Sequence, residues 1–392
     1  MVFGLFETGF AGLSWEILVM ICIGCVLLYL GISKKMEPLL LVPIGFGVII
    51  VNLPFGGLME TIVAGQVMDS YVIGAEPAGV MARIFSYGLT WEIIPVFIFL
   101  GLGALQDFGP VIANPKTLLL GAGAQFGVYF AFFLALILGS AFPETLHIGI
   151  KEAASIGIIG GADGPTTIYL TNRLAPHFIG ATAVAAYTYM ALVPIIQPPI
   201  IKLLTSKKER QIYMKPQLRE VSKKEKMFFP IIGALIIILM VPKSAPLIGL
   251  FMFGNLIKEC GVTDRLADTA GNALMNTLTI MLGLAVGCFM SADTFLRTES
   301  LVVFALGIIA FSASTAFGVL LAKLMNLFLK EKINPMIGAA GVSAVPMAAR
   351  VVQRMGQQEN PRNFLLMHAM GPNIAGVIGT ATAAGIFLGM LG

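Results

Sequence analysis

Residues 148–170 read IGIKEAASIGIIGGADGPTTIYL, and one aspartate, Asp163, lies in the glycine-rich centre of this mostly apolar stretch. An isolated carboxylate in hydrocarbon is expensive, so ionisable residues inside a membrane usually line a water- or ion-filled site. The glycines and the proline around Asp163 are poor helix formers, and we expect the helix to break there. A broken helix beside a carboxylate is typical of cation sites in secondary transporters. Asp163 also fits the N-cap of a second half-helix in a surface loop, and the two interpretations are compatible.

The composition is that of a polytopic membrane protein. The chain of 392 residues is 57% hydrophobic and 12% charged, with a mean hydropathy of +0.89, whereas soluble domains carry about 25% charged residues. The apolar runs are long and lack strict alternation, which predicts helices. The net charge of +4 is concentrated in short loops, so it indicates topology and not a nucleic-acid partner.

The apolar segments are long enough to predict most of the membrane helices. They lie near residues 15–31, 38–53, 91–107, 117–141, 177–204, 227–242, 246–260, 274–291, 300–329 and 363–391. Two interrupted, glycine-rich segments lie near 148–174 and 333–355. Residues 54–90 are less apolar, and they predict either an amphipathic surface stretch or a short extra membrane element.

Basic residues between the apolar segments mark three cytoplasmic loops under the positive-inside rule. The longest, residues 202–226, holds nine Lys or Arg and three Glu. The other two contain Lys34 with Lys35, and Lys330 with Lys332. The long loop is either a docking surface for a soluble partner or a plain topology-setting linker. We therefore expect an N-terminal transmembrane half, a cytoplasmic linker and a C-terminal transmembrane half at residues 1–201, 202–226 and 227–392.

These loops place the two interrupted segments on opposite sides of the membrane. With the three loops in the cytoplasm, the segment near 148–174 must leave and return on the outer side. The segment near 333–355 must leave and return on the cytoplasmic side. Each is therefore expected to be a re-entrant hairpin, one from each face.

An internal repeat supports this arrangement. At an offset of 181 residues, GIIGGADGPTTIYLTNR (157–173) aligns with GAAGVSAVPMAARVVQR (338–354), with four identities in seventeen positions. The same offset superposes the flanking apolar segments of the two halves. Inverted repeats of this kind place the ion site at the repeat interface near the midplane. The predicted fold is an all-α polytopic membrane protein of two inverted repeats, whose broken-helix hairpins meet near the bilayer midplane.

Only the first hairpin supplies a charge. Ala344 matches Asp163 in the alignment, and Ser343 lies beside it. Asn334 and the glycine backbone offer further neutral oxygens. One carboxylate with several neutral oxygens suits a small hard cation such as Na⁺. A proton carrier does not need the extra oxygens, and a Ca²⁺ or Mg²⁺ site needs more carboxylates.

Further polar residues lie within apolar segments. Asn373 follows a glycine and a proline in the last segment, and an amide inside the membrane needs partners. Tyr187 and Tyr189 lie in one predicted span, where tyrosines also serve as interface anchors. Arg350 on the second hairpin either snorkels, bonds the carbonyls of a helix end, repels a cation or holds a carboxyl group.

Three strings of this sequence resemble a known family. GGADGPTTIYLTNRLAP (160–176), NPMIGAAGVSAVPMAARVVQ (334–353) and MGPNIAGVIGTATAAG (370–385) resemble the membrane β-subunit of the biotin-dependent, sodium-pumping decarboxylases. That family includes the oxaloacetate, methylmalonyl-CoA, glutaconyl-CoA and malonate decarboxylase pumps. The resemblance covers nearly the whole chain and is least distinctive in the first 60 residues.

The resemblance implies a function and a set of site residues. A soluble carboxyltransferase subunit moves CO₂ onto biotin on a carrier protein. The β-subunit then decarboxylates the carboxybiotin, consumes a proton and exports Na⁺. The resemblance implies Na⁺ binding by Asp163, Asn334, Asn373 and Ser343, and catalytic roles for Arg350, Tyr189 and Ser343. The sequence shows no departure from the family at these positions.

The resemblance also implies the setting of the protein. It implies a multi-pass protein of the inner, cytoplasmic membrane, whose partners are the carboxyltransferase, the biotin carrier protein and a small single-span membrane subunit. It further implies a homotrimer and an elevator-like movement of the hairpin domain, which composition and spacing do not show. The residues that contact carboxybiotin, the acid that feeds the pump and the number of bound Na⁺ stay open.

A coupling hypothesis follows from the charge of Asp163. Na⁺ would neutralise the carboxylate and lower the cost of carrying the hairpin through the bilayer, so we expect only an occupied site to move. Two other functions stay open. A stand-alone sodium-coupled carboxylate transporter needs an anion pocket, which Ser343, Thr166 and Arg350 could nearly provide, and it needs no biotinylated partner. A non-transporting scaffold subunit leaves Asp163 without a purpose.

Overall fold

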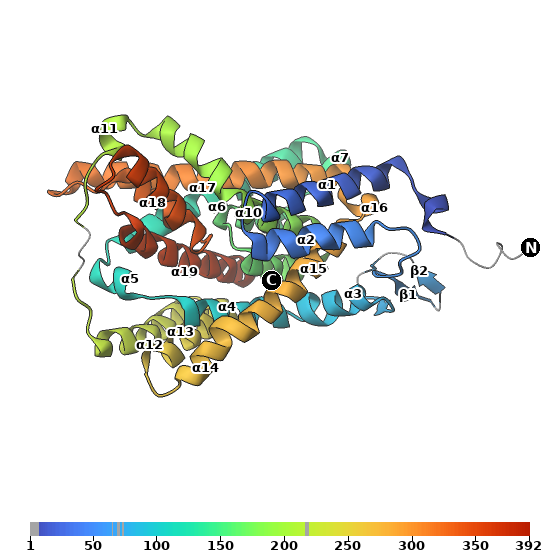
Figure 1. Cartoon of the computed structure of the whole chain (residues 1–392), viewed down its shortest axis with the longest axis horizontal. Helices are drawn as coiled ribbons and strands as arrows, with labels where there is room; N and C mark the ends of the chain where they lie inside the picture. The colour runs from blue at the N-terminus through green and yellow to red at the C-terminus, as the bar shows by residue number, and fades with distance from the viewer. Residues whose placement is uncertain (1–7, 65, 69–70, 73, 216–218) are drawn as a thin grey trace, which may run out of the picture.

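The chain folds into an elongated bundle of helices (Figure 1). The computed structural model describes residues 8–392 apart from 65, 69–70, 73 and 216–218. Six helical stretches in this part of the chain are long and apolar enough to cross a membrane. Their main helices are α1 (Trp15–Ile32), α6 (Thr117–Ala141), α10 (Ile179–Leu204), α15 (Met275–Cys288), α17 (Thr298–Phe328) and α19 (Leu366–Leu391). The predicted polytopic, mainly helical membrane protein is confirmed.

The other predicted apolar segments are also helical, but they are shorter or carry more charge. They form α2 (Pro38–Val51), α4 (Ile93–Leu105), α12 (Lys223–Met240) and α13 (Ala245–Glu259). α4 is preceded by α3 (Val80–Arg83) and the π-helix η2 (Ile84–Thr90), and a bend of 62° separates the two parts. This bent pair is either a broken span or a re-entrant loop.

Residues 54–90 contain a small sheet, which the sequence does not predict. β1 (Thr61–Val63) pairs antiparallel with β2 (Gln66–Met68) and with β3 (Glu76–Pro77), so the strand order is β2-β1-β3. The strands are two or three residues long. Alternation over so few residues cannot be distinguished from irregular chain, and neither of the two interpretations drawn from the sequence for this segment includes a sheet.

Short helices complete the chain. α14 (Asp264–Asp268) and the π-helix η6 (Thr269–Leu274) lead into α15, and η4 (Pro176–Phe178) leads into α10. The remaining short elements are η1 (Gly9–Gly12), α5 (Gly109–Ala113), α7 (Pro143–Leu146), α11 (Lys207–Arg210), η5 (Pro242–Ser244) and α16 (Ala292–Phe295).

Helix packing places the two interrupted segments in the centre of the bundle. α6 packs against both α17 and α19, and these three helices contact the interrupted segments of both halves. α1 packs on α2, α2 on α15, and α4 on α13 at the outside of this group.

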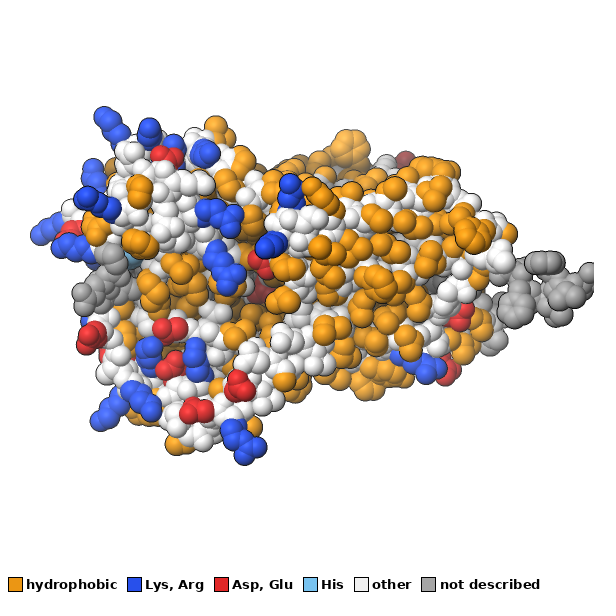
Figure 2. Space-filling view, viewed as in Figure 1, with side chains coloured by type: hydrophobic (Ala, Val, Ile, Leu, Met, Phe, Trp, Pro, Cys, Tyr) orange, Lys and Arg blue, Asp and Glu red, His pale blue; other side chains and the backbone are white. Residues whose placement is uncertain are grey.

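Lys and Arg side chains gather at the end of the molecule that carries α11, whereas hydrophobic side chains cover much of the remaining surface in this view (Figure 2). The positive-inside rule assigns the basic end to the cytoplasm.

Each half of the chain contains an interrupted helical segment. The first consists of α8 (Ile150–Gly157), the 3₁₀-helix η3 (Ile158–Gly161) and α9 (Gly164–Leu174). The second consists of the 3₁₀-helix η7 (Pro335–Gly341) and α18 (Met347–Glu359). The interruptions lie where the glycines and prolines predict them, while the inverted relation of the halves and the re-entrant path stay predictions.

Candidate cation site

The first interrupted segment places Asp163 at the start of a helix. Ala162 has a left-handed backbone (φ +54°), which ends η3, and Asp163 is the extended N-cap of α9. The Asp163 Oδ1 accepts a hydrogen bond from the Thr166 N–H at 3.1 Å. Pro165 lies in the first turn of α9, where a missing N–H is tolerated. The helix break predicted at the acid is confirmed, and Asp163 also has the capping role.

The Asp163 carboxylate is buried, and one of its oxygens has no partner. The residue is 3% exposed, and its Oδ2 has no hydrogen-bond partner among the described residues. A buried polar atom without a partner costs about 1–3 kcal/mol, and more when it belongs to a charged group. An ordinary surface cap would stay solvated, so the burial favours a ligand site over a surface loop.

Other buried oxygens lie close to this carboxylate. The hydroxyls of Thr166 and Ser343 lie near it, and its charge acts on the Tyr187 phenol. Within the described part of the chain, Thr166 Oγ1 and the Tyr187 hydroxyl also have no hydrogen-bond partner. The Tyr187 ring packs against Gly164, where a Cβ would come within 2.3 Å of the ring. A glycine is therefore required beside Asp163.

The second interrupted segment contacts the first through Ser343. The Ser343 backbone N–H and its Oγ both donate hydrogen bonds to the Gly161 carbonyl, at 2.8 Å and 2.7 Å. Ser343 is 5% exposed. Ser343, two residues after the end of η7, therefore lies against the end of η3, next to Asp163.

Asn373 on α19 holds the end of η7 that lies next to Ser343. Its Nδ2 donates hydrogen bonds to the carbonyls of Ala340 and Val342, at 3.0 Å and 2.7 Å. Both amide donors are therefore used by the second interrupted segment, and the Asn373 Oδ1 is left buried without a partner in the described structure. A side chain whose nitrogen is held in this way presents its oxygen in a defined direction.

The donor set has the chemistry of a site for a hard monovalent cation. It combines one carboxylate oxygen with hydroxyl and amide oxygens, which are ligands that hard cations prefer. A cation at this point would satisfy several buried oxygens at once and neutralise the carboxylate. Among the described residues, no group of three or more His, Cys, Asp or Glu is placed to hold a metal ion. The arrangement therefore offers one charge, which matches Na⁺ better than a divalent ion.

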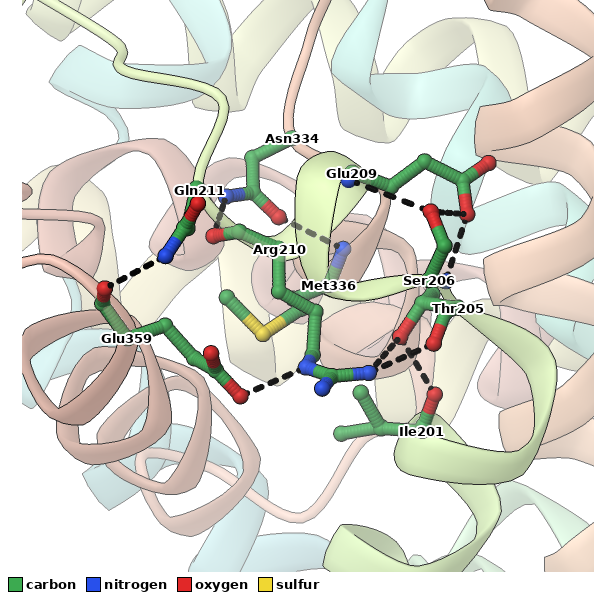
Figure 3. Close-up of polar contacts among 9 residues, drawn as sticks. All are labelled: Ile201, Thr205, Ser206, Glu209, Arg210, Gln211, Asn334, Met336 and Glu359. Carbon is green, nitrogen blue, oxygen red and sulfur yellow. Dashed lines mark hydrogen bonds and ion pairs between the residues drawn. The ribbon is translucent and has the colours of Figure 1, made fainter.

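Asn334 lies elsewhere. It is the N-cap of η7, at the end away from Ser343. Its Nδ2 donates to the Arg210 carbonyl at 2.7 Å, and its Oδ1 accepts from the Met336 N–H at 3.1 Å (Figure 3). The Nδ2 also donates to the Ile212 carbonyl at 3.1 Å. The amide is thus fully used by backbone groups, and the structure does not bring it to the Asp163 group.

Tyr189 and Arg350 also point away from the unpartnered oxygens. The Tyr189 hydroxyl donates to the carbonyl of Phe304 on α17. Arg350 is exposed on α18, and its charge acts on Glu37, in the loop between α1 and α2. Burial raises the pKa of the Glu37 carboxyl, and the Arg350 charge lowers it. Arg350 therefore faces a solvated part of the protein.

Tyr187 is the neighbour of Asp163 that the sequence does not single out. Tyr187 and Tyr189 are two residues apart on α10, and such residues face different sides of a helix. Sequence alone does not indicate which side faces the carboxylate. The requirement for glycine at Gly164 is the nearest signal, because it indicates that a bulky group approaches the acid.

Comparison with known proteins identifies the family of this chain. The family model described as "Na+-transporting oxaloacetate decarboxylase beta subunit" matches residues 16–391. The methylmalonyl-CoA decarboxylase subunit beta of Propionigenium modestum is 54% identical, over 98% of this chain and 98% of its own. The glutaconyl-CoA decarboxylase subunit beta of Acidaminococcus fermentans is 54% identical, over 98% and 96%. The probable oxaloacetate decarboxylase beta chain of Vibrio cholerae is 49% identical, over 98% and 96%.

The family model and these relatives cover almost the whole chain. The relatives are named for three different acids at nearly equal identity, so similarity alone does not select one of them. The chain belongs to the family of Na⁺-transporting oxaloacetate decarboxylase beta subunits, and it is the membrane subunit of a multi-subunit decarboxylase.

Proposed function

We propose that this chain couples the decarboxylation of carboxybiotin on a partner subunit to the export of Na⁺ across the cytoplasmic membrane. Loss of CO₂ from carboxybiotin breaks a nitrogen–carbon bond and leaves that nitrogen to take up a proton. The chain provides the path and the binding site for the ion that this downhill step drives. The movement is of the alternating-access type, with the hairpin domain shifting like an elevator.

The observation that carries this proposal is the group of buried oxygens around Asp163. Asp163 Oδ2, Thr166 Oγ1, the Tyr187 hydroxyl and Asn373 Oδ1 have no hydrogen-bond partners among the described residues. They come from α9, α10 and α19, and Ser343 joins the second interrupted segment to them. Na⁺ bound by Asp163 with these neutral oxygens would remove the cost of leaving them buried and unpaired.

Occupancy of this site would control movement. An empty site leaves a carboxylate in the membrane interior, where a charge is costly. A bound Na⁺ cancels that charge. The ion shifts the equilibrium between the inward- and outward-facing states only by the difference in its affinity for them. The occupied hairpin domain therefore crosses, and the empty one does not.

Arg350, Ser343 and Tyr189 have supporting roles in this scheme. Arg350 is exposed and has no hydrogen-bond partner in the described part of the chain, so its guanidinium is available to a carboxylate. Ser343 connects the two interrupted segments. Tyr189 fixes α10 to α17 through the Phe304 carbonyl. These contacts support a model in which carboxylate binding near α18 is transmitted to the ion site.

The partners in this scheme are a carboxyltransferase subunit, a biotin carrier protein and a small single-span membrane subunit, around a homotrimer of this chain. The described residues of the basic loop 202–226 include α11, at the end of the molecule where Lys and Arg side chains gather (Figure 2), and soluble partners would have access there. The choice of acid is expected to belong to the carboxyltransferase, because relatives named for different acids share this chain's sequence almost equally.

The proposal is tested by isolating the complex and reconstituting it in vesicles. We expect a biotinylated protein to co-purify with the chain, and oxaloacetate, methylmalonyl-CoA or glutaconyl-CoA to drive ²²Na⁺ movement together with CO₂ release. Na⁺-dependent uptake of a carboxylate by the chain alone, without a biotinylated partner, would instead identify a stand-alone carboxylate transporter. Absence of any Na⁺ movement would identify a scaffold subunit.

Removal of the hydroxyl at position 187 distinguishes the two neighbouring tyrosines. We expect Tyr187→Phe to raise the Na⁺ concentration for half-maximal thermal stabilisation roughly tenfold, because a hydrogen-bonding group near a charge contributes about 1.5–3 kcal/mol. Without Na⁺ this variant should be as stable as the wild type, since it removes an unpartnered hydroxyl.

Tyr189→Phe is the matched control. It removes the bond to the Phe304 carbonyl and should lower the free energy of unfolding by about 1–3 kcal/mol, with the Na⁺ midpoint unchanged. Thermal unfolding in NaCl and in KCl at equal ionic strength measures both effects. If the midpoint shifted with Tyr189→Phe and not with Tyr187→Phe, the assignment of Tyr187 would be wrong.

A further inference from the structure

Residues 205–215, here called the strap, follow α10 along the cytoplasmic end of the molecule. Ser206 caps α11, and its N–H donates to Glu209 Oε2 at 2.7 Å (Figure 3). Glu209 also pairs with Lys323 of α17, at 3.1 Å. The strap is therefore tied both to itself and to a membrane helix.

Arg210 joins the strap to the second interrupted segment. Its Nε donates to Glu359 Oε1, at the end of α18, at 2.7 Å, and its Nη1 donates to the Thr205 carbonyl (Figure 3). The side chains of Arg210 and Glu359 are only 12% and 16% exposed. Loss of one partner from a buried ion pair leaves an uncompensated buried charge and strongly lowers the stability of the contact region. Loss of one partner from an exposed pair has little effect.

Asn334 holds the backbone of the same strap. Its Nδ2 donates to the Arg210 carbonyl, and its Oδ1 caps η7 through the Met336 N–H (Figure 3). The Nδ2 also donates to the Ile212 carbonyl. Asn334 is fully buried. One amide thus links the strap to the first residues of η7.

Two more buried side chains fix the far end of the strap. Asn363 donates to the Ile212 carbonyl at 2.8 Å and accepts from the Met214 N–H at 3.2 Å. The ring of His368 is hydrogen-bonded through Nε2 to the Lys215 carbonyl, at 2.8 Å. Backbone carbonyls and an N–H of the strap therefore find their partners in side chains of the C-terminal half.

The helix η7 connects Asn334 to the candidate cation site. A 3₁₀-helix rises about 2.0 Å per residue, so the seven residues of η7 span roughly 14 Å. Asn334 lies at one end. At the other end Asn373 holds two carbonyls, and Ser343 bonds the first interrupted segment. Runs of 3₁₀-helix this long are uncommon.

The middle of η7 is also held. Gln197 of α10 donates to the Ala339 carbonyl at 2.9 Å. Gly338 packs on Gly318 of α17 so closely that a Cβ on Gly338 would lie 2.1 Å from the Gly318 carbonyl oxygen. η7 therefore has little room to bend, so its two ends are expected to keep their relative positions.

We propose that Asn334, Arg210 and Glu359 are positioning residues for Na⁺ binding, and that the strap couples the cytoplasmic linker to the cation site through η7. The inference rests on the proposed Na⁺ site around Asp163. Asn334 acts without touching the ion, because its nitrogen and its oxygen are already used by backbone groups. A partner that moves the linker would thereby alter the position of Ser343.

The test measures the Na⁺ midpoint of thermal stabilisation, with KCl as the reference, for Arg210→Gln, Glu359→Gln, Asn334→Ala and the double variant Asn334→Ala/Glu359→Gln. We expect each single change to raise the midpoint by roughly 5–50-fold, within the usual range of coupling between sites. The double variant should be no worse than the more severe single variant, because both changes break one connection. Arg210→Lys should recover part of the loss.

The control is an ion pair of the same residue types in the same linker. Arg219 and Glu225 lie 2.9 Å apart, but their side chains are 50% and 40% exposed. Arg219→Gln and Glu225→Gln should leave the midpoint unchanged. If Asn334→Ala abolished the Na⁺ response while Arg210→Gln and Glu359→Gln left it at the wild-type value, Asn334 would be a direct ligand and the proposal would be overturned.

Hydrogen exchange provides a readout that does not depend on Na⁺. Amides of residues 336–343 should exchange faster in Arg210→Gln and Glu359→Gln, and should be unchanged in Arg219→Gln, because local protection reports the stability of the contacts that hold a segment. Unchanged protection in the Arg210→Gln and Glu359→Gln variants would overturn the proposed coupling through the strap. If the variants show this exchange pattern but the wild type responds equally to Na⁺ and K⁺, the proposed Na⁺ site is refuted and the mechanical connection remains.

Discussion

Asp163→Asn is expected to abolish Na⁺-specific stabilisation and Na⁺ transport. The asparagine keeps the shape of the side chain and an oxygen that can accept the Thr166 N–H, so the cap of α9 survives. It removes the only negative charge of the cation site. Two unit charges 4 Å apart interact by about 4 kcal/mol at an effective dielectric constant of about 20. That energy corresponds to roughly a thousandfold in Na⁺ affinity.

The same substitution should not weaken the protein in the absence of Na⁺. Asp163 Oδ2 is buried without a partner in the described structure, and removing an uncompensated charge relieves its desolvation. We therefore expect Asp163→Asn in KCl to be at least as stable as the wild type. A loss of stability in KCl would show that capping, and not ion binding, is the main role of the carboxylate.

The measurement is the melting temperature during titration with NaCl, with KCl at equal ionic strength as the reference. A ligand that binds only the folded protein raises the melting temperature by mass action. Asp107→Asn is the matched control, because Asp107 pairs with Lys226 at 2.8 Å and lies outside the membrane helices. Its Na⁺ response should equal that of the wild type. Equal effects of Na⁺ and K⁺ on the wild type, or transport at the wild-type rate by Asp163→Asn, would contradict the proposed site.

Gly376→Ala is expected to have the second largest effect. Gly376 lies on α19, where an added Cβ would come within 2.2 Å of the Gly341 carbonyl oxygen. Backbone cannot move aside as a flexible side chain does, so α19 and the second interrupted segment must separate. Overpacking of this kind costs about 1–3 kcal/mol, and occasionally more. Asn373 lies one turn earlier on the same helix and would lose its hold on the carbonyls of Ala340 and Val342.

Gly376→Ala should therefore reduce both stability and Na⁺ affinity. Gly389→Ala is the control on the same helix, because a Cβ at Gly389 meets no atom within 4 Å. Alanine favours a helix over glycine by up to about 1 kcal/mol, so this control should be neutral or slightly stabilising. Melting curves of both variants in NaCl and KCl measure the two effects. Equal behaviour of the two variants would mean that α19 does not need its close approach to Gly341.

The helical, membrane-spanning character of this chain and the helix break at Asp163 could be predicted from sequence. Both depend on local properties. Long apolar runs require helices in a membrane, and glycines with a proline end a helix wherever they occur. Residue type also indicated the oxygens of Asp163, Asn334, Ser343 and Asn373 as candidate cation ligands, which stays a prediction. The family relationship could be recognised from strings of the sequence. The sheet at Thr61–Pro77 could not, because strands of two or three residues have no measurable period.

Only the tertiary structure decided which of these side chains face one another. Tyr187 and Tyr189 have the same residue type and the same neighbourhood in sequence, and the packing of α10 turns the first toward Asp163 and the second toward Phe304. Asn334 and Asn373 are both amides beside an interruption. One is consumed by the strap, more than a hundred residues away in sequence, and the other keeps a free oxygen. Local composition determines where a helix can form or end, whereas the partner of a buried polar atom depends on contacts between distant parts of the chain, and those exist only once the bundle is packed.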